Sequence, residues 1–433
     1  MNEVVVGLIA MAVLLLLFLT GIELAFCMAI VGFVGFSYLV ATAAAFNLLA
    51  KDFFDSLASY GFTVIPLFIF MGQIAFNSGI AKKLFEAAHR FIGHIPGGLA
   101  LATVVGATIF KAICGSSPAT AATFASVAVP EMDRYGYDKR LSTGIVATVG
   151  TLGILIPPSV TLIVFGVITE QSIGRLFMAG LVPGLMISVC FMFIIVGWAK
   201  MNPAIAPRAD RSPWSARFAS VPEVAWPVII FLVVIGGLLK GFFTPSEAGS
   251  IGCSAVIVLA LLKRSLGWKA FVKSVDESLR TACMVIMLIA GSAVLGHFIA
   301  VTNIPMLAAE WIASLPAPRW IIMIVISFFY LLGGSFIDDM AFMILATPIF
   351  YPAILKLGYD PMWFGMIIAI TVMVGVVIPP VAINVFVVKN ITKTPFSVIY
   401  AGVYPFLLSL LFVGILLFIF PSICTFLPNM LYK

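Results

Sequence analysis

Charged residues are scarce in this sequence. Asp, Glu, Lys and Arg make up 10% of its 433 residues, whereas 62% of the residues are hydrophobic. Soluble domains typically have about 25% charged and about 45–50% apolar residues. The composition therefore excludes a soluble domain and predicts an integral protein that crosses the lipid bilayer several times. The net charge of +6 is small, and we interpret it as the charge of cytoplasmic loops, with no nucleic-acid partner.

Residues suited to catalysis or metal binding are also few. The three histidines have no metal-ligand spacing, and the six cysteines are scattered, which is typical of small packing residues. The sequence has no Ser/His/Asp arrangement and no glycine-rich phosphate-binding loop in a usable context. We therefore predict that the protein is not an enzyme and has no cofactor or ATP site. An ion gradient must then drive any uphill transport.

Long apolar runs are abundant, and one of them, residues 141–170, is interrupted near its middle. Gly150, Gly153 and the pair Pro157-Pro158 lie at the interruption. Proline donates no backbone hydrogen bond, so a helix cannot continue unperturbed through the pair. Lipid cannot satisfy the freed peptide groups, which must be buried in protein or line a wet cavity. The run predicts a discontinuous transmembrane helix at the ion or solute site of a transporter.

The second half of the chain repeats this element. Residues 362–392 contain the pair Pro379-Pro380, and 379 minus 157 is 222. Identical residues at this offset include Pro130 and Pro352, Gly136-Tyr137-Asp138 and Gly358-Tyr359-Asp360, and Gly153 and Gly375. The matches extend well beyond the double prolines, so the sequence predicts a duplicated membrane unit.

Two further apolar stretches predict helical hairpins. Residues 98–130 are interrupted by Gly115-Ser116-Ser117-Pro118, and residues 320–356 have a small polar turn at 333–339. Two half-length arms joined by such a turn are typical of a re-entrant hairpin whose tip stops within the membrane.

These elements predict an all-α polytopic membrane protein with an inverted structural repeat, two re-entrant hairpins and two discontinuous helices. The first repeat is residues 1–199, with scaffold spans in 4–80, hairpin 98–130, broken span 141–170 and span 175–199. A cytoplasmic linker, 200–221, precedes the second repeat, 222–433, with spans in 222–301, hairpin 320–356, broken span 362–392 and span 397–420.

Loop charge predicts the orientation. Basic residues cluster in 82–90, 134–140, 200–217 and 263–273, which fall on one side if each hairpin returns to the side that it entered. The positive-inside tendency makes this side cytoplasmic and places both termini in the periplasm. Each half then crosses an odd number of times, so the two repeats are inverted and their hairpin tips meet near the midplane.

Polar residues at these breaks are the candidates for function. Asp338 and Asp339 are the only adjacent carboxylates at predicted membrane depth, where an ionisable group is costly. They could equally lie at an exposed turn or cap the second hairpin arm. At an offset of 222 they correspond to Ser116 and Ser117. Lys111 could pair with a substrate acid group, pair with an aspartate, or extend toward the interface.

The order of motifs along the chain resembles that of one transporter family. FIFMGQIAFNSGIAKKLF, GHIPGGLALATVV, CGSSPATAAT, TLGILIPPS, SIGRLFMAGLVPG and FTPSEAG are similar to segments of the large membrane subunit of tripartite ATP-independent periplasmic (TRAP) transporters. The resemblance implies an elevator-type carrier of a wider ion-transporter superfamily, located in the bacterial inner membrane. It also implies two partners, a small four-helix membrane subunit and a periplasmic substrate-binding protein, with sodium as the coupling ion.

The resemblance also implies site residues. Sodium is expected at Gly115, Ser116, Ser117, Thr151, Gly153 and Pro157, and at Ser335, Asp338, Thr371, Gly375 and Pro379. From the polar groups at the breaks and tips themselves, the substrate is expected at Lys111, Ser117, Thr120, Pro158, Ser159, Asp339, Pro380 and Asn384. Some positions depart from the family pattern, since Lys111 stands where a small residue is usual and Cys114 where a serine is common.

Together these observations predict sodium-coupled uptake of an organic acid anion, such as a dicarboxylate, a sialic or other sugar acid, or a sulfonate. A periplasmic binding protein would deliver the substrate. The alternative is a stand-alone sodium- or proton-coupled organic anion symporter of the same superfamily.

Overall fold

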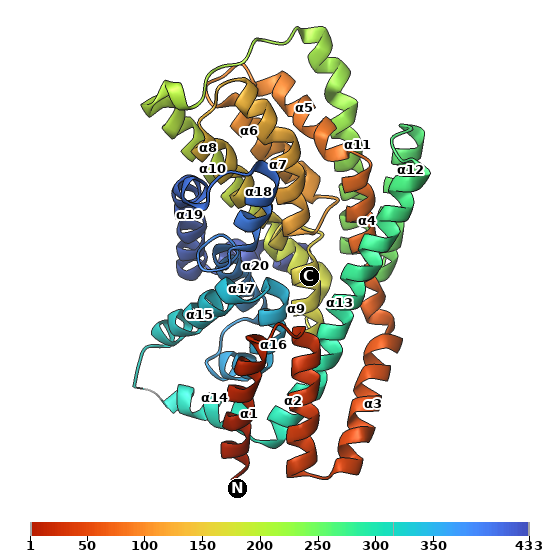
Figure 1. Cartoon of the computed structure of the whole chain (residues 1–433), viewed down its shortest axis with the longest axis vertical. Coiled ribbons are helices and arrows are strands. Elements are labelled where there is room, and N and C mark those ends of the chain that lie inside the picture. Colours follow the sequence, from red (N-terminus) through yellow and green to blue (C-terminus); the bar gives the residue numbers. More distant parts are fainter. Residues whose placement is uncertain (1, 315, 432–433) are drawn as a thin grey trace.

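The computed structural model describes residues 2–314 and 316–431, and every regular element in these ranges is a helix. Eight of the helices are long and apolar enough to cross a membrane. The predicted class, an all-α polytopic membrane protein, is therefore confirmed. Figure 1 shows an elongated molecule with the N-terminus near one end of its long axis.

Within the described residues, the first half of the chain contains ten α-helices and two 3-10 segments. In order they are α1 (Glu3–Phe18), α2 (Leu24–Leu39), α3 (Thr42–Ala58), η1 (Tyr60–Thr63), α4 (Val64–Asn77), α5 (Ile80–Ile92), α6 (Gly98–Lys111), α7 (Ser117–Arg134), α8 (Lys139–Val149), η2 (Gly150–Ile154), α9 (Val160–Ile168) and α10 (Ile173–Met201).

The second half contains the remaining helices. After η3 (Pro203–Ile205) they are α11 (Trp214–Leu239), α12 (Pro245–Leu262), α13 (Trp268–Val301), α14 (Ile304–Ser314), α15 (Arg319–Phe336), α16 (Asp339–Lys356), α17 (Pro361–Gly375), α18 (Ile383–Thr392), α19 (Phe396–Ile419) and α20 (Ser422–Leu431).

The helix bounds follow the offset read from the sequence. Adding 222 to the bounds of α7, 117 and 134, gives 339 and 356, the bounds of α16. Figure 1 shows α5 near one end of the long axis and its counterpart α14 near the other, as expected for copies with opposite orientation. The division into repeats at 199 and 222 remains a prediction.

Charged residues made helix α3 and the start of α13 differ from what the sequence patterns suggested. Helix α3 was not anticipated, because Lys51, Asp52 and Asp55 interrupt its apolar pattern. In the second half, α13 begins at Trp268 and runs for 34 residues, and its first turns carry charged residues that hide its start from a hydropathy pattern. At the offset of 222, this one helix corresponds to α3, η1 and α4 together. The first repeat therefore has three separate elements where the second repeat has one continuous helix.

The connection between the halves is shorter than predicted and is held in place. Helices α10 and α11 extend into it, which leaves residues 202–213 between them. The Ala209 backbone N–H donates to the Gly93 carbonyl at 3.1 Å, and the Asp138 N–H donates to the Ile205 carbonyl at 2.9 Å. Residues 202–213 therefore form a strap across the loops that precede α6 and α8.

The turn of the second hairpin is also shorter than predicted. The range 333–339 is wrong as a turn, because α15 continues through Phe336 and α16 begins at Asp339. Gly333 faces the ring of Phe342 so closely that a Cβ atom would overlap it. Packing between the two arms therefore keeps the glycines helical, and only Ile337 and the helix-capping Asp338 form the turn.

Candidate functional site

The first broken span has the predicted interruption, and its backbone is buried. Helix α8 ends at Val149, η2 follows, and α9 begins at Val160. The Ser159 hydroxyl donates to the Ile154 carbonyl at 2.7 Å and accepts from the Leu162 N–H at 3.2 Å. One side chain thus satisfies a carbonyl before the double proline and an amide after it.

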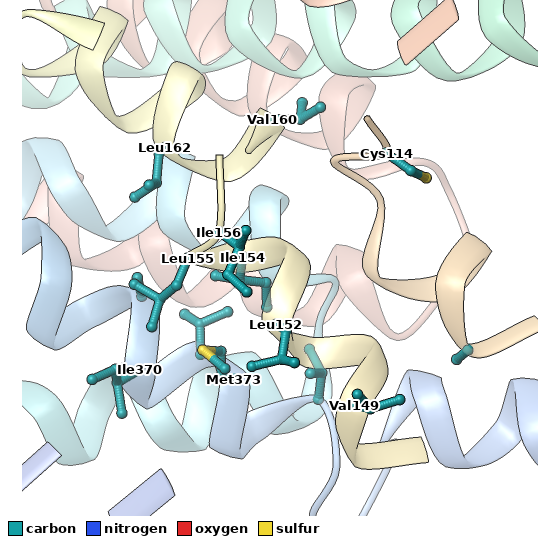
Figure 2. Packing of buried hydrophobic residues seen from close by; sticks show 14 of the residues in the cluster. Cys114, Val149, Leu152, Ile154, Leu155, Ile156, Val160, Leu162, Ile370 and Met373 are labelled. Atoms are coloured by element: carbon teal, nitrogen blue, oxygen red, sulfur yellow. The ribbon is translucent and has the colours of Figure 1, made fainter. Parts of the chain in front are cut away.

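Apolar side chains fill the other side of this break. Figure 2 shows Leu152, Leu155 and Ile156 gathered near Met373 and Ile370 of α17. All five side chains are buried. The first broken span therefore packs on the second one through an apolar surface. Its polar groups lie on the opposite side.

The tip of the first hairpin lies on the polar side of the break. Ser116 caps α7, with its hydroxyl accepting from the Ala119 N–H at 3.3 Å. A Cβ atom on Gly115 would collide with the Pro158 carbonyl oxygen, which explains why the tip needs a glycine there. The predicted residues Gly115, Ser116 and Pro158 are thus brought together.

Lys111 and Thr120 converge on the same carbonyl group of this tip. The Lys111 ammonium donates to the Ser116 carbonyl at 2.8 Å, and the Thr120 hydroxyl donates to it at 3.0 Å. Both side chains are fully buried. The Lys111 side chain also lies against Gly153 of η2, so the tip and the break share this contact.

Asn384 joins the two halves of the chain. Its side-chain NH2 lies 3.0 Å from the Ser117 hydroxyl at the first tip and donates to the Ala147 carbonyl at 3.1 Å in α8. Asn384 is in the first turns of α18, after the second break, and is fully buried. A residue of the second repeat therefore completes the polar surroundings of the first tip.

The second broken span and second hairpin form a similar pair. Helix α17 ends at Gly375, and the Val381 N–H donates to the Ser335 carbonyl at 3.0 Å. A Cβ atom on Gly375 would come within 2.9 Å of the Gly334 backbone. Pro379 and Pro380 differ from their buried counterparts Pro157 and Pro158, because both are exposed. The second break therefore opens to the surface of this chain.

The two aspartates of the second tip lie at different depths. Asp338 caps α16, with one carboxylate oxygen accepting from the N–H groups of Met340 at 3.1 Å and Ala341 at 3.3 Å. Asp339 begins the helix and is 5% exposed. The capping role, one of the sequence alternatives, is therefore present at Asp338, and it leaves the buried Asp339 carboxylate near the helix N-terminus, where its charge is favourable.

A small cavity of about 50 Å³ lies where the two tips meet. Its walls come from α4, the first tip, α9, α13 and α16. The lining residues are Phe68, Ile69, Gly72, Gln73, Cys114, Gly115, Ser116, Ala119, Val160, Thr281 and Met340. Ser116 belongs to the first hairpin and Met340 to the second, so an ion or solute in this cavity would contact both repeats.

Of the predicted sodium residues, Gly115 and Ser116 line this cavity and the others do not, Thr371 and Thr151 among them. The Thr371 hydroxyl donates to the Ile367 carbonyl in its own helix at 2.8 Å, and the side chain lines an outer apolar groove of about 400 Å³ with α15 and α19. The Thr151 hydroxyl similarly donates to the Thr148 carbonyl at 2.7 Å. The remaining predicted residue, Pro157, is buried within the first break.

Gln73 and Thr281 were not anticipated as site residues. The side-chain carbonyl oxygen of Gln73 is buried without a hydrogen-bond partner among the described residues, and both residues line the cavity. Gln73 is a lone amide within the apolar segment FIFMGQIAF, which is a signal that sequence reasoning could have used. Thr281 follows a charged stretch, and its sequence context gives no comparable signal.

The geometry defines a class of fold, a polytopic helical membrane protein with two helical hairpins and two broken spans. Its fold is similar to that of the YdaH transporter of Alcanivorax borkumensis, with a TM-score of 0.59, 13% identity and 89% of each chain covered.

The family is shown by the sequence comparisons. Residues 11–423 match the model of the tripartite ATP-independent periplasmic transporter, DctM component, and the chain belongs to this family. It is 34% identical over 386 residues to the C4-dicarboxylate TRAP transporter large permease protein of Pseudomonas aeruginosa, covering 88% of this chain and 90% of that one. It is 32% identical to the isethionate TRAP transporter permease protein DctMQ of Oleidesulfovibrio alaskensis, covering 89% of this chain and 62% of that one.

Proposed function

We propose that this large permease subunit takes up an organic acid anion, coupled to sodium, across the bacterial inner membrane. A separate periplasmic protein would deliver the anion. Relatives named for a four-carbon dicarboxylate and for isethionate, a sulfonate, support an acidic substrate. The membrane potential constrains the number of coupled cations, because moving one charge through 100 mV is worth about 2.3 kcal/mol. Uptake of a monoanion therefore gains from the membrane potential only when two or more cations accompany it.

The observation that carries the proposal is the meeting of both hairpin tips at one buried cavity. Hydroxyl and carboxylate oxygens at the tips, such as those of Ser116 and Asp338, are suited to a small hard cation. The amides that follow the breaks favour an anion, because a helix N-terminus carries partial positive charge. Cation and anion sites next to each other let each ligand strengthen the binding of the other, which is the basis of symport.

We also propose an elevator movement. The mobile unit would consist of the hairpins and broken spans, and the scaffold would consist of α1 to α4, α11 and α12. Helices α11 and α12 form an exposed apolar groove of about 470 Å³ lined by residues such as Trp226, Val233 and Leu262. This groove is a suitable surface for the small membrane subunit, which is fused to the large subunit in proteins with a DctMQ name.

Reconstitution into proteoliposomes tests the proposal. The complex with the small subunit should take up the acid bound by its periplasmic partner when a sodium gradient is imposed. Ser116→Ala and Asp338→Ala should reduce that uptake, whereas Ser126→Ala, which removes an exposed hydroxyl of α7 bonded to its own helix, should not. Uptake that persists without sodium and follows a proton gradient alone would refute the coupling. Uptake without the periplasmic protein would instead favour a stand-alone symporter.

A further inference from the structure

A buried cationic side chain lies behind the first hairpin tip. Lys111 is 0% exposed and is not among the residues that line the small cavity where the two tips meet. Its ammonium group donates to the Ser116 carbonyl at 2.8 Å. Burying a charge is costly unless the charge is paired and hydrogen-bonded. A buried ammonium group therefore needs hydrogen-bond acceptors such as the Ser116 carbonyl. Its place behind the tip is also unsuited to the direct contact with substrate that we considered from the sequence.

The Ser116 carbonyl has no remaining capacity for a metal ion. It accepts from the Lys111 ammonium at 2.8 Å, from the Thr120 hydroxyl at 3.0 Å and from the Thr120 N–H at 3.3 Å. A carbonyl oxygen has two lone pairs. Three donors therefore saturate the oxygen that would otherwise be the tip's ligand for a cation.

The lysine also occupies the space beside the first break. A Cβ atom on Gly153 would overlap the Lys111 ammonium nitrogen and would lie 3.0 Å and 3.1 Å from the next two carbons of the side chain. Gly153 belongs to η2, where the helix is interrupted. The ammonium thus lies between the tip and the break, which is the position expected for a bound cation.

The two hairpins differ in charge at equivalent positions. Adding 222 to 111 gives Gly333, so the second hairpin has no lysine there, whereas Ser116 and Ser117 correspond to Asp338 and Asp339. The first hairpin therefore carries a lysine where the second carries a glycine, and the second tip carries two carboxylates where the first carries two serines.

We propose that the Lys111 ammonium is a resident cation that fills the first-tip cation position and closes it to sodium, leaving the second tip for exchangeable sodium. The inference rests on the proposed sodium coupling. A resident cation moves inward with the loaded unit and outward with the empty unit, so it adds nothing to the net charge per cycle. A sodium ion in the same position would move inward only.

Measuring the coupling stoichiometry tests this inference. The reversal potential of acid flux in proteoliposomes would be compared for the wild type, Lys111→Ala and Thr103→Ala, a control in the same arm whose hydroxyl bonds its own helix at Leu99. We expect Lys111→Ala to couple one more sodium ion, and to move one more positive charge, per substrate than the wild type and the control. Equal stoichiometries would overturn the inference. Wild-type uptake driven by a pH gradient and lost in Lys111→Ala would also overturn it, because Lys111 would then be a proton carrier.

A measurement on the wild type avoids dependence on a variant that fails to fold. Anomalous scattering from thallium(I), used as a heavy substitute for sodium, would locate cations in crystals of the complex. Thallium at the second tip with none coordinated by the Ser116 carbonyl supports the inference. Thallium on that carbonyl, or none at the second tip, overturns it. If the wild type shows sodium-independent uptake, the proposed function itself fails, which the uptake assay reveals before either test is interpreted.

Discussion

At the scale of single residues, Gly153 and Lys111 form a pair whose coupling can be measured. All three of the closest atoms that a methyl group at position 153 would meet belong to Lys111. Gly153→Ala should therefore destabilise the protein by about 1–3 kcal/mol through overpacking. In a Lys111→Ala background the same substitution should cost far less, because the obstructing atoms are gone. Thermal unfolding of the four members of this double-mutant cycle in detergent measures the coupling.

Gly115→Ala is the matched control for that cycle. Its added methyl group would meet the Pro158 carbonyl, which is backbone, and none of its three closest atoms belongs to Lys111. Lys111→Ala should therefore not relieve the cost of Gly115→Ala. Equal relief at both glycines would mean that the lysine variant loosens the whole tip and would contradict a specific contact at Gly153.

Asn384 gives a second prediction at this scale. Asn384→Ala removes the bonds to the Ser117 hydroxyl and the Ala147 carbonyl and leaves buried polar groups unpaired. Leaving one such group unsatisfied costs about 1–3 kcal/mol. The melting temperature should fall clearly below that of Asn47→Ala, an exposed site on α3. A melting temperature equal to that of the control would show that the link between the halves contributes nothing to stability.

At the scale of helices, the sequence predicted the breaks better than the contacts made across them. The double prolines and the offset of 222 can be read directly from the sequence, and both interruptions were predicted correctly. The convergence of Lys111, Thr120 and Ser116 depends on how one tip folds back on itself. The link from Asn384 to Ser117 spans 267 residues. Neither is visible without the tertiary structure, although each polar residue stood out within an apolar segment.

The errors at this scale have physical causes as well. Charged residues conceal α3 and the start of α13 from a reading based on hydropathy, although both form long helices. The predicted turn at 333–339 relied on Gly333, where the ring of Phe342 leaves no room for a side chain. Glycine in that arm therefore indicates close packing, whereas Gly115 in the first tip indicates a true turn.

The start of α8 provides a prediction with a defined pH dependence. Asp138 caps this helix, and side-chain hydrogen bonds from Arg140, the shortest at 2.8 Å, hold the pKa of its carboxyl group below the usual value. A lowered pKa means that ionisation stabilises the fold above the ordinary carboxyl pKa, and that this stabilisation is lost as the pH falls through the lower value. Asp138→Ala should cost about 1 kcal/mol at neutral pH through the lost cap.

Thermal unfolding as a function of pH checks this prediction. Asp138→Asn keeps a capping oxygen and loses only the charge, so its difference from the wild type should be smaller than that of Asp138→Ala. The difference between the Asp138→Asn variant and the wild type should also disappear in strong acid. A constant difference across the whole pH range would contradict an ionic contribution from Arg140.

At the scale of the whole molecule, the elevator proposal requires the first hairpin tip to slide past α4. A Cβ atom on Gly72 of α4 would lie 3.7 Å from the Cβ atom of the native Cys114 and 3.3 Å from its sulfur. Disulfides commonly join residues whose Cβ atoms are about 3.5–4.5 Å apart. Gly72→Cys should therefore form a disulfide with Cys114 under an added oxidant, and it would fix the tip to the scaffold in this state.

Oxidation should then abolish uptake by Gly72→Cys proteoliposomes, and a reducing agent should restore it. Two controls separate locking from simple crowding at position 72. Gly72→Ser adds a side chain of similar size without a second thiol, and Gly72→Cys with Cys114→Ala removes the partner, so neither should respond to oxidant. A cross-linked protein, verified by mass spectrometry, that still transports at the normal rate would mean that the tip and α4 move together. The boundary of the mobile unit would then have to lie elsewhere.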